Sequence, residues 1–188
     1  MAAPAEKTIN DLNGQWILNK KLSDSSEPIL ALQGIGFLIR KSVNLATISL
    51  DINQYQAPPK APNTSTDTFT HIDITQSASG LTNTHENRCA DETFREHSDW
   101  LFGSVKAKSK FITLDELDDD FLKQGWLVEG DGHFLMSYAE SQDNGWVATQ
   151  VWGFEEINGE RRYVRHVRVT KGSERVTAKL IYDYVPKN

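Results

Sequence analysis

Alternating aromatic and amide side chains make the segment from Trp146 to Phe154 the part of the chain best suited to hold a ligand. Successive side chains of a β-strand point to opposite faces, so one face carries Trp146, Ala148, Gln150, Trp152 and Phe154. The opposite face holds small and β-branched residues, and neither face suits water. Two indoles, a phenyl ring and one carboxamide predict either a packed core or the lining of a cavity for a large, mostly apolar molecule.

Gln150 is the polar group of this face that could act on a bound molecule. Its carboxamide can donate a hydrogen bond to a carbonyl and accept one from an enol or hydroxyl. Tyr182 shares a face of the last apolar run with Leu180 and Tyr184, and its phenol could be a second donor. The alternative for both residues is a packing role with the polar atoms satisfied by backbone or water.

Histidine and arginine side chains around residue 166 form a further candidate group. A period of two places His166 with Val164 and Arg168, and an inward His166 or Arg168 could polarise a ligand carbonyl. Hydropathy instead places Val167 and Val169 inside, which would turn His166 and Arg168 outward. Both arrangements fit the sequence.

His71 and Asp73 lie two residues apart and therefore on one face of a strand. A carboxylate raises the basicity of a neighbouring imidazole, so the pair could contact a ligand or transfer a proton. The alternative is an exterior polar face opposite buried Ile72 and Ile74.

The residue pattern predicts neither a metal nor an organic cofactor. Glu96, His97 and Asp99 have no spaced set of further ligands, and the acidic run 115–120 lacks the glycine and terminal glutamate of a calcium loop. The sequence contains no phosphate loop, nucleophile elbow or dinucleotide fingerprint.

Composition restricts the possible partners. The chain has 188 residues and a formal net charge of −6, which argues against binding to nucleic acid or to an anionic membrane surface. Its single cysteine, Cys89, excludes an internal disulfide. Residues 1–10 do not read as a secretory signal, and no apolar run has the length of a membrane helix. We therefore expect a cytoplasmic protein whose partner is an apolar small molecule.

Strand patterns dominate the chain outside one helical segment. Residues 1–10 are expected to be flexible, and residues 11–188 to form one domain. Two short helices, 27–33 and 37–46, follow a first strand at 15–20, and Phe37 of the second helix is expected to contact the ligand. Further strands are predicted at 48–53, 69–76, 82–91, 101–111, 146–154, 163–170 and 176–185, with a proline-containing loop or flap at 56–68. This order predicts an all-β fold, a single antiparallel up-and-down barrel with a short helix-turn-helix after the first strand.

The beginning and end of the chain resemble the fatty-acid-binding proteins of the calycin superfamily. The resemblance is carried by Gly14-Gln15-Trp16, by Gly34-Ile35-Gly36-Phe37 continuing to Arg40-Lys41, and by Leu180-Ile181-Tyr182-Asp183. The segments 71–76 and 96–103 resemble small fungal lipocalin-like proteins that are often encoded among secondary-metabolite enzymes. The resemblance implies a lipocalin-like barrel with an internal ligand site.

Departures from the fatty-acid binders bear on the ligand. In that family an arginine two residues before the tyrosine of the last strand, and another on a neighbouring strand, hold the ligand carboxylate. This chain keeps Tyr182 but has Leu180 and Trp152 at those places, which argues for a neutral, cyclic or conjugated ligand.

Some cofactor-free cyclases of fungal pathways, including Diels–Alder catalysts, are built on such barrels. The resemblance thus implies a cofactor-independent cyclase or isomerase that acts on an apolar polyketide or terpenoid intermediate in natural-product biosynthesis. The alternative is a non-catalytic carrier of an apolar small molecule.

Overall fold

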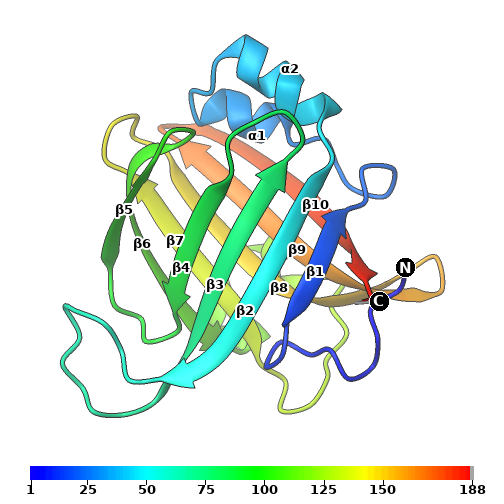
Figure 1. Ribbon diagram of the computed structural model, residues 1–188, viewed down its shortest axis with the longest axis vertical. Coiled ribbons are helices and arrows are strands. Elements are labelled where there is room, and N and C mark those ends of the chain that lie inside the picture. Colours follow the sequence, from blue (N-terminus) through cyan, green and yellow to red (C-terminus); the bar gives the residue numbers. More distant parts are fainter. Residues whose placement is uncertain (187–188) are drawn as a thin grey trace.

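One antiparallel sheet of ten strands curls into a nearly closed barrel in the computed structural model, which describes residues 1–186 (Figure 1). The strand order is β4-β3-β2-β1-β10-β9-β8-β7-β6-β5, so almost every strand pairs with its neighbour in sequence. β4 and β5 are the two ends of this order and do not pair with each other, which leaves one gap in the wall. The predicted all-β barrel is confirmed.

The ten strands and the helices have the following bounds. The strands are β1 (Gly14–Leu18), β2 (Ile48–Ala57), β3 (Phe69–Ala78), β4 (Thr84–Cys89), β5 (Arg95–Asp99), β6 (Gly103–Ile112), β7 (Phe134–Ser141), β8 (Val147–Ile157), β9 (Glu160–Lys171) and β10 (Glu174–Val185). The helices are α1 (Glu27–Leu32), α2 (Phe37–Leu45), the 3-10 helix η1 (Leu114–Glu116) and α3 (Asp120–Lys123).

Helices α1 and α2 lie across one end of the barrel, which we call the lid end (Figure 1). Pro28 is in the first turn of α1, where its missing N–H is not needed. Ile29, Leu30 and Leu32 are buried and attach α1 to the barrel, so the predicted helix-turn-helix is confirmed.

The opposite end of the barrel, which we call the floor, is filled with side chains. Trp16 lies 5.1 Å from Tyr163 and 6.4 Å from Phe154 between ring centroids, and all three are at most 3% exposed. The N-terminal residues 1–10, expected to be flexible, lie against this end. Ala3 and Ile9 are buried, and the Ala3 N–H donates to the Arg161 carbonyl.

The hairpin between β8 and β9 turns at Asn158-Gly159, where both residues have positive φ angles of 54° and 78°. This geometry matches the strand twist and is favoured by Asn-Gly, as the sequence predicts. The register places Gln150 opposite Val167 and Trp152 opposite Arg165.

A second layer of residues covers the outer faces of β7, β8 and β9. Residues 114–126, which contain η1 and α3, place Leu117, Leu122 and Trp126 against Phe134 and Val151. Burial on both sides explains why neither face of the Trp146–Phe154 segment is suited to water. The sequence shows only an acidic run at 115–120 here and did not predict α3, β5 or β7.

Candidate functional site

The lid half of the barrel is hollow. A cavity of about 140 Å³ lies beneath α1 and α2, and we call it the lid cavity. A second cavity of about 290 Å³ lies along β4, β5 and β6, beside the gap in the wall, and we call it the gap cavity. Gln33, Phe102, Ala148 and Gln150 line both cavities, which therefore adjoin around these four side chains.

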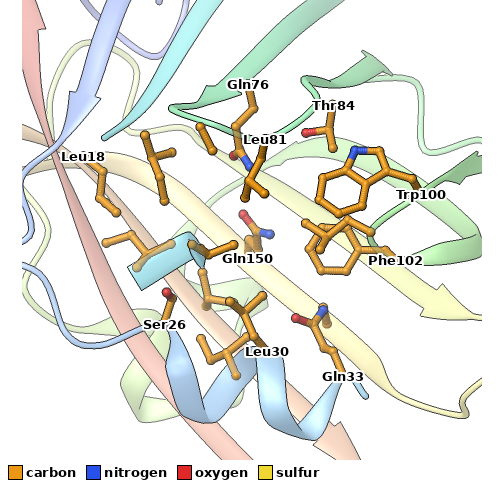
Figure 2. Close-up of a pocket in the computed structure, with 18 of the residues that line it drawn as sticks. Leu18, Ser26, Leu30, Gln33, Gln76, Leu81, Thr84, Trp100, Phe102 and Gln150 are labelled. Carbon is orange, nitrogen blue, oxygen red and sulfur yellow. The ribbon is translucent and has the colours of Figure 1, made fainter. Parts of the chain in front are cut away.

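Gln150 stands at the centre of the lid cavity lining, with Gln76 from β3 and Gln33 from the end of α1 around it (Figure 2). Its Oε1 accepts a hydrogen bond from the Trp152 indole N–H at 3.0 Å. An indole N–H can only donate, so this contact fixes the oxygen of the amide toward Trp152. The amide NH₂ is left to donate to a molecule in the cavity.

Two further residues with donor groups line the cavities, although the indole N–H of Trp146 is itself covered by protein atoms. Trp146 lines the gap cavity, and its buried indole N–H has no hydrogen-bond partner within residues 1–186. Tyr182 lines the lid cavity. Burial raises the pKa of Tyr182 despite the opposing charge of Arg165, so its phenol stays protonated at neutral pH and can donate.

Leu180 also lines the lid cavity, as expected from its place beside Tyr182. The predicted aromatic lining is only partly correct, because Trp152 and Phe154 belong to the packed floor and are 0% and 3% exposed. Tyr184 packs edge-on against Trp16, with 5.0 Å between centroids, and does not reach either cavity. The alternating face thus lines a cavity at Trp146 to Gln150 and fills the core at Trp152 to Phe154.

A buried charged cluster separates the gap cavity from the floor. Arg88 of β4 donates to Glu86 Oε2 from Nε at 3.0 Å and from Nη2 at 2.7 Å, and Nη1 donates to the Ser137 hydroxyl. Arg165 of β9 lies with its guanidinium carbon 3.7 Å from the Trp152 ring centroid, and its Nε donates to the Tyr163 hydroxyl at 2.8 Å. Cation–π contact with an aromatic face compensates a buried guanidinium in part.

Electrostatics keep Glu86 ionised. Burial acts to raise the pKa of this carboxyl, but the charges of Arg88 and then Arg165 outweigh burial and hold the pKa below its usual value. From sequence alone, strand alternation places Glu86 and Arg88 on one face and indicates no more than a cross-strand ion pair. Their inward position was missed because hydropathy assigns charged residues to the outside.

His166 and Arg168 face away from the cavities, so the expectation that they polarise a ligand is wrong in its geometry. Both ring nitrogens of His166 are engaged in the outer layer, Nδ1 with the Phe121 carbonyl at 2.7 Å and Nε2 with Glu155 Oε1 at 2.5 Å. Arg168 donates to Asp119 at 2.9 Å. The hydropathy alternative is confirmed, because Val167 lines the lid cavity and Arg165 is the inward arginine of β9.

His71 also lies outside the cavities. Its ring stacks on Tyr55 with 5.1 Å between centroids, and Nε2 contacts the Pro58 carbonyl at 3.0 Å. Ile72 and Ile74 on the opposite face are buried in the floor cluster, so His71 points outward from the barrel as the alternative predicts. It is not a solvent-exposed position, however, because His71 is only 3% exposed. Phe37 is 56% exposed on α2 beneath Lys41 and lines neither cavity, because α2 turns Val43 rather than Phe37 toward the lid cavity.

His97 and Asp99 of β5 line the gap cavity. His97 Nε2 lies 3.3 Å from Asp99 Oδ2, while Oδ1 of the same carboxylate accepts from the N–H groups of Leu101 and Phe102.

No group of three or more His, Cys, Asp or Glu side chains in residues 1–186 is arranged to hold a metal ion. No helix in that range is long and apolar enough to cross a membrane.

Solved structures with the same fold are fatty-acid-binding proteins and their relatives. The REP1-NXSQ fatty acid transporter superimposes with a TM-score of 0.57 at 16% identity, covering 94% of this chain and 98% of that protein. Fatty-acid-binding protein 1 of Echinococcus granulosus gives a TM-score of 0.55 at 11% identity, covering 93% and 98%. At these identities the likeness establishes the fold alone.

Two fungal proteins are similar to the chain over nearly its whole length. Probable pericyclase scpY of Mollisia scopiformis is 35% identical over 187 residues, covering 98% of this chain and 95% of the relative. Pericyclase pydY of Acremonium sp is 29% identical over 187 residues, covering 98% and 97%. No protein-family model matches the sequence. With this identity across both full lengths, the chain belongs to the family of these fungal pericyclases, which in this protein takes the form of a fatty-acid-binding-protein-like barrel.

Proposed function

We propose that this protein is a cofactor-independent pericyclase that folds a linear, apolar polyene intermediate, a polyketide or terpenoid, inside the adjoining cavities and closes it into a ring. The observation that carries the proposal is Gln150, whose NH₂ is directed into the hollow half of the barrel by its hydrogen bond to Trp152. Membership of a pericyclase family supports the reaction class.

A pericyclic ring closure exchanges π bonds for σ bonds within one molecule, so no atom, proton or electron enters or leaves. Such a reaction needs neither a nucleophile nor a metal from the protein. It needs the reacting ends of the chain to be held together, and orientation of this kind can supply several kcal/mol of the barrier lowering.

In this proposal the apolar walls of the lid cavity and the apolar part of the gap cavity fold the substrate, and Phe102 and Ala148 shape the passage between them. The Gln150 amide donates to a substrate carbonyl conjugated with the reacting double bond and withdraws electron density from it. Donors positioned in advance at a site of developing charge contribute further stabilisation of the transition state. Tyr182 on the wall of the lid cavity is an additional donor available for the same purpose.

Turnover tests this proposal. Purified protein is incubated with a linear polyene that carries a conjugated carbonyl, and product formation is compared with the uncatalysed background by chiral chromatography and mass spectrometry. The proposal expects faster closure and a single stereoisomer. Binding of the polyene without acceleration would support the carrier alternative, to which the fatty-acid-transporter-like fold gives some weight.

A further inference from the structure

A histidine–aspartate pair borders the gap cavity on β5. Nε2 of His97 lies 3.3 Å from Oδ2 of Asp99, and both side chains line the cavity. Oδ1 of the same carboxylate accepts hydrogen bonds from the backbone N–H groups of Leu101 and Phe102 at 2.8 and 2.7 Å, which fix its position. An ionised carboxylate accepts hydrogen bonds and cannot donate them, so Nε2 carries the proton of the neutral imidazole.

The second ring nitrogen of His97, Nδ1, is therefore the basic one. No hydrogen bond within residues 1–186 involves Nδ1, and the side chain keeps 36% of its surface uncovered. A carboxylate that fixes the tautomer of an imidazole, and leaves the other nitrogen facing the reacting atoms, is the arrangement in which histidine acts as a general base. His97 has this arrangement inside a cavity.

Charged side chains from all sides of the gap share this cavity with His97. They are Glu86 and Arg88 of β4, Arg95, Glu96 and Asp99 of β5, Lys108 of β6, and Lys60 of the loop before β3. The charges of Arg88 and Arg165 outweigh burial and hold the pKa of Glu86 below its usual value, which makes this carboxylate a weak base. The uncharged basic nitrogen of the lining is thus Nδ1 of His97.

Gln150 lines the same cavity of about 290 Å³. A ligand whose carbonyl accepts a hydrogen bond from the Gln150 amide extends its conjugated carbons into the space that His97 borders. A C–H bond on the carbon γ to a conjugated carbonyl is acidic, because the negative charge left behind is delocalised onto the carbonyl oxygen. A donor already placed at that oxygen stabilises the charge as it develops.

We propose that His97 is a general base that isomerises a conjugated enone of the ligand to a dienol, with Asp99 as its positioning residue. Nδ1 takes the γ proton, and the electron pair of that C–H bond moves through the conjugated carbons onto the oxygen held by Gln150. The imidazolium then returns the proton to this oxygen, so a C–H bond is exchanged for an O–H bond without oxidant or reductant. The dienol is a 1,3-diene, and the inference rests on the proposed function in that this diene is the group to be closed into a ring.

Deuterium exchange tests this activity separately from ring closure. (E)-Dec-3-en-2-one has a conjugated carbonyl and a γ-CH₂ group but no second π system with which to cyclise. Loss of its γ-proton signal in heavy water is followed by proton NMR near neutral pH. The natural protein is expected to exchange this position at least about a hundredfold faster than free imidazole at the same concentration, since a positioned general base contributes about 10²–10⁴-fold.

His97→Ala should lower the exchange rate by at least about a hundredfold, and added imidazole should restore part of it by entering the space that the ring has left. Asp99→Asn should lower kcat for exchange by at least about tenfold and leave KM within about twofold, because it disturbs the tautomer and not the binding of the ketone. The matched control is His133→Ala. It removes the histidine of a second pair, 3.1 Å from Asp131, that borders neither cavity, and the exchange rate should not change.

Exchange by the natural protein at the rate of free imidazole would overturn the proposal, as would a folded His97→Ala variant that keeps the full rate or one that imidazole does not rescue. If thermal melting shows that His97→Ala does not fold, His97→Gln replaces it, and if neither folds the natural protein decides alone. Because the ketone cannot cyclise, a protein that closes polyenes without γ exchange would refute this inference and leave the proposed function standing. Exchange without ring closure would do the reverse.

Discussion

Replacing Gln150 by leucine separates the two tasks that the structure gives to this side chain. Leucine is close in size, so the passage between the cavities stays shaped, but both the donor to the substrate and the acceptor for Trp152 are lost. A neutral hydrogen bond contributes about 0.5–1.5 kcal/mol, and about 1.4 kcal/mol corresponds to a tenfold change in rate. We therefore expect kcat for ring closure to fall by up to about tenfold, with a smaller change in KM.

Stability should also fall, for a separate reason. The indole N–H of Trp152, on a side chain with no exposed surface, would lose its acceptor, and an orphaned buried donor costs about 1–3 kcal/mol. In a chain of this length each kcal/mol lowers Tm by roughly 2–4 °C. Differential scanning calorimetry should record a loss of several degrees.

A double-mutant cycle with Trp152→Phe distinguishes the two effects. Without an indole N–H to orphan, the leucine substitution should cost about 1–3 kcal/mol less stability than in the natural background, whereas the fold-loss in kcat should persist. Gln142→Leu, at an exposed turn outside the cavities, is the matched control and should change neither quantity. A Gln150→Leu variant that loses stability but keeps its full kcat would refute the assignment of Gln150 as the donor.

Three further perturbations test other parts of the account. Ala148→Phe should block the passage between the cavities, so that calorimetry detects no binding of decanol while Tm is maintained. A loss of about 1–3 kcal/mol in the free energy of unfolding, as for an overpacked core, would mean that the region is not hollow. Glu155→Gln should weaken the outer contact with His166 and lower the free energy of unfolding in urea by on the order of 2 kcal/mol, while KM stays constant; a changed KM with unchanged stability would contradict the outer-layer role. Burial and then the nearby Asp91 raise the pKa of the Cys89 thiol from 9.0 to about 11, so the thiolate fraction at pH 8 falls roughly a hundredfold. Iodoacetamide should therefore label the native protein correspondingly more slowly than the unfolded chain. Equal labelling rates would contradict the shift in pKa.

Much of the architecture was predictable from local patterns. Strands with one face toward the interior and one toward solvent were predicted, because their residues alternate in burial. In β2, for example, Ile48, Leu50 and Ile52 are buried and the residues between them are not. The Asn158-Gly159 turn and the helices after the first strand were predicted for the same reason, since their residue preferences arise from backbone geometry. Gln150, Trp146, Tyr182 and Leu180 were also placed on cavity walls, as the alternation indicates.

The remainder depended on packing that a single strand does not reveal. β9 is buried on both faces because residues 114–126 cover it, so hydropathy and period two gave opposite answers for His166 and Arg165. Trp152 and Gln150 share one face, and only the depth of the floor decides that the first is core and the second borders a cavity. The inward position of Glu86 was not predicted, because one of the arginines that stabilise its charge, Arg165, is far away in the sequence.

A crystal structure of the protein with its cyclised product would show whether the ring closes inside the barrel. We expect the product to occupy the adjoining lid and gap cavities, with a carbonyl oxygen about 3 Å from Nε2 of Gln150. A product bound outside the barrel, or lid-half side chains that close the space and leave Gln150 out of contact, would contradict it.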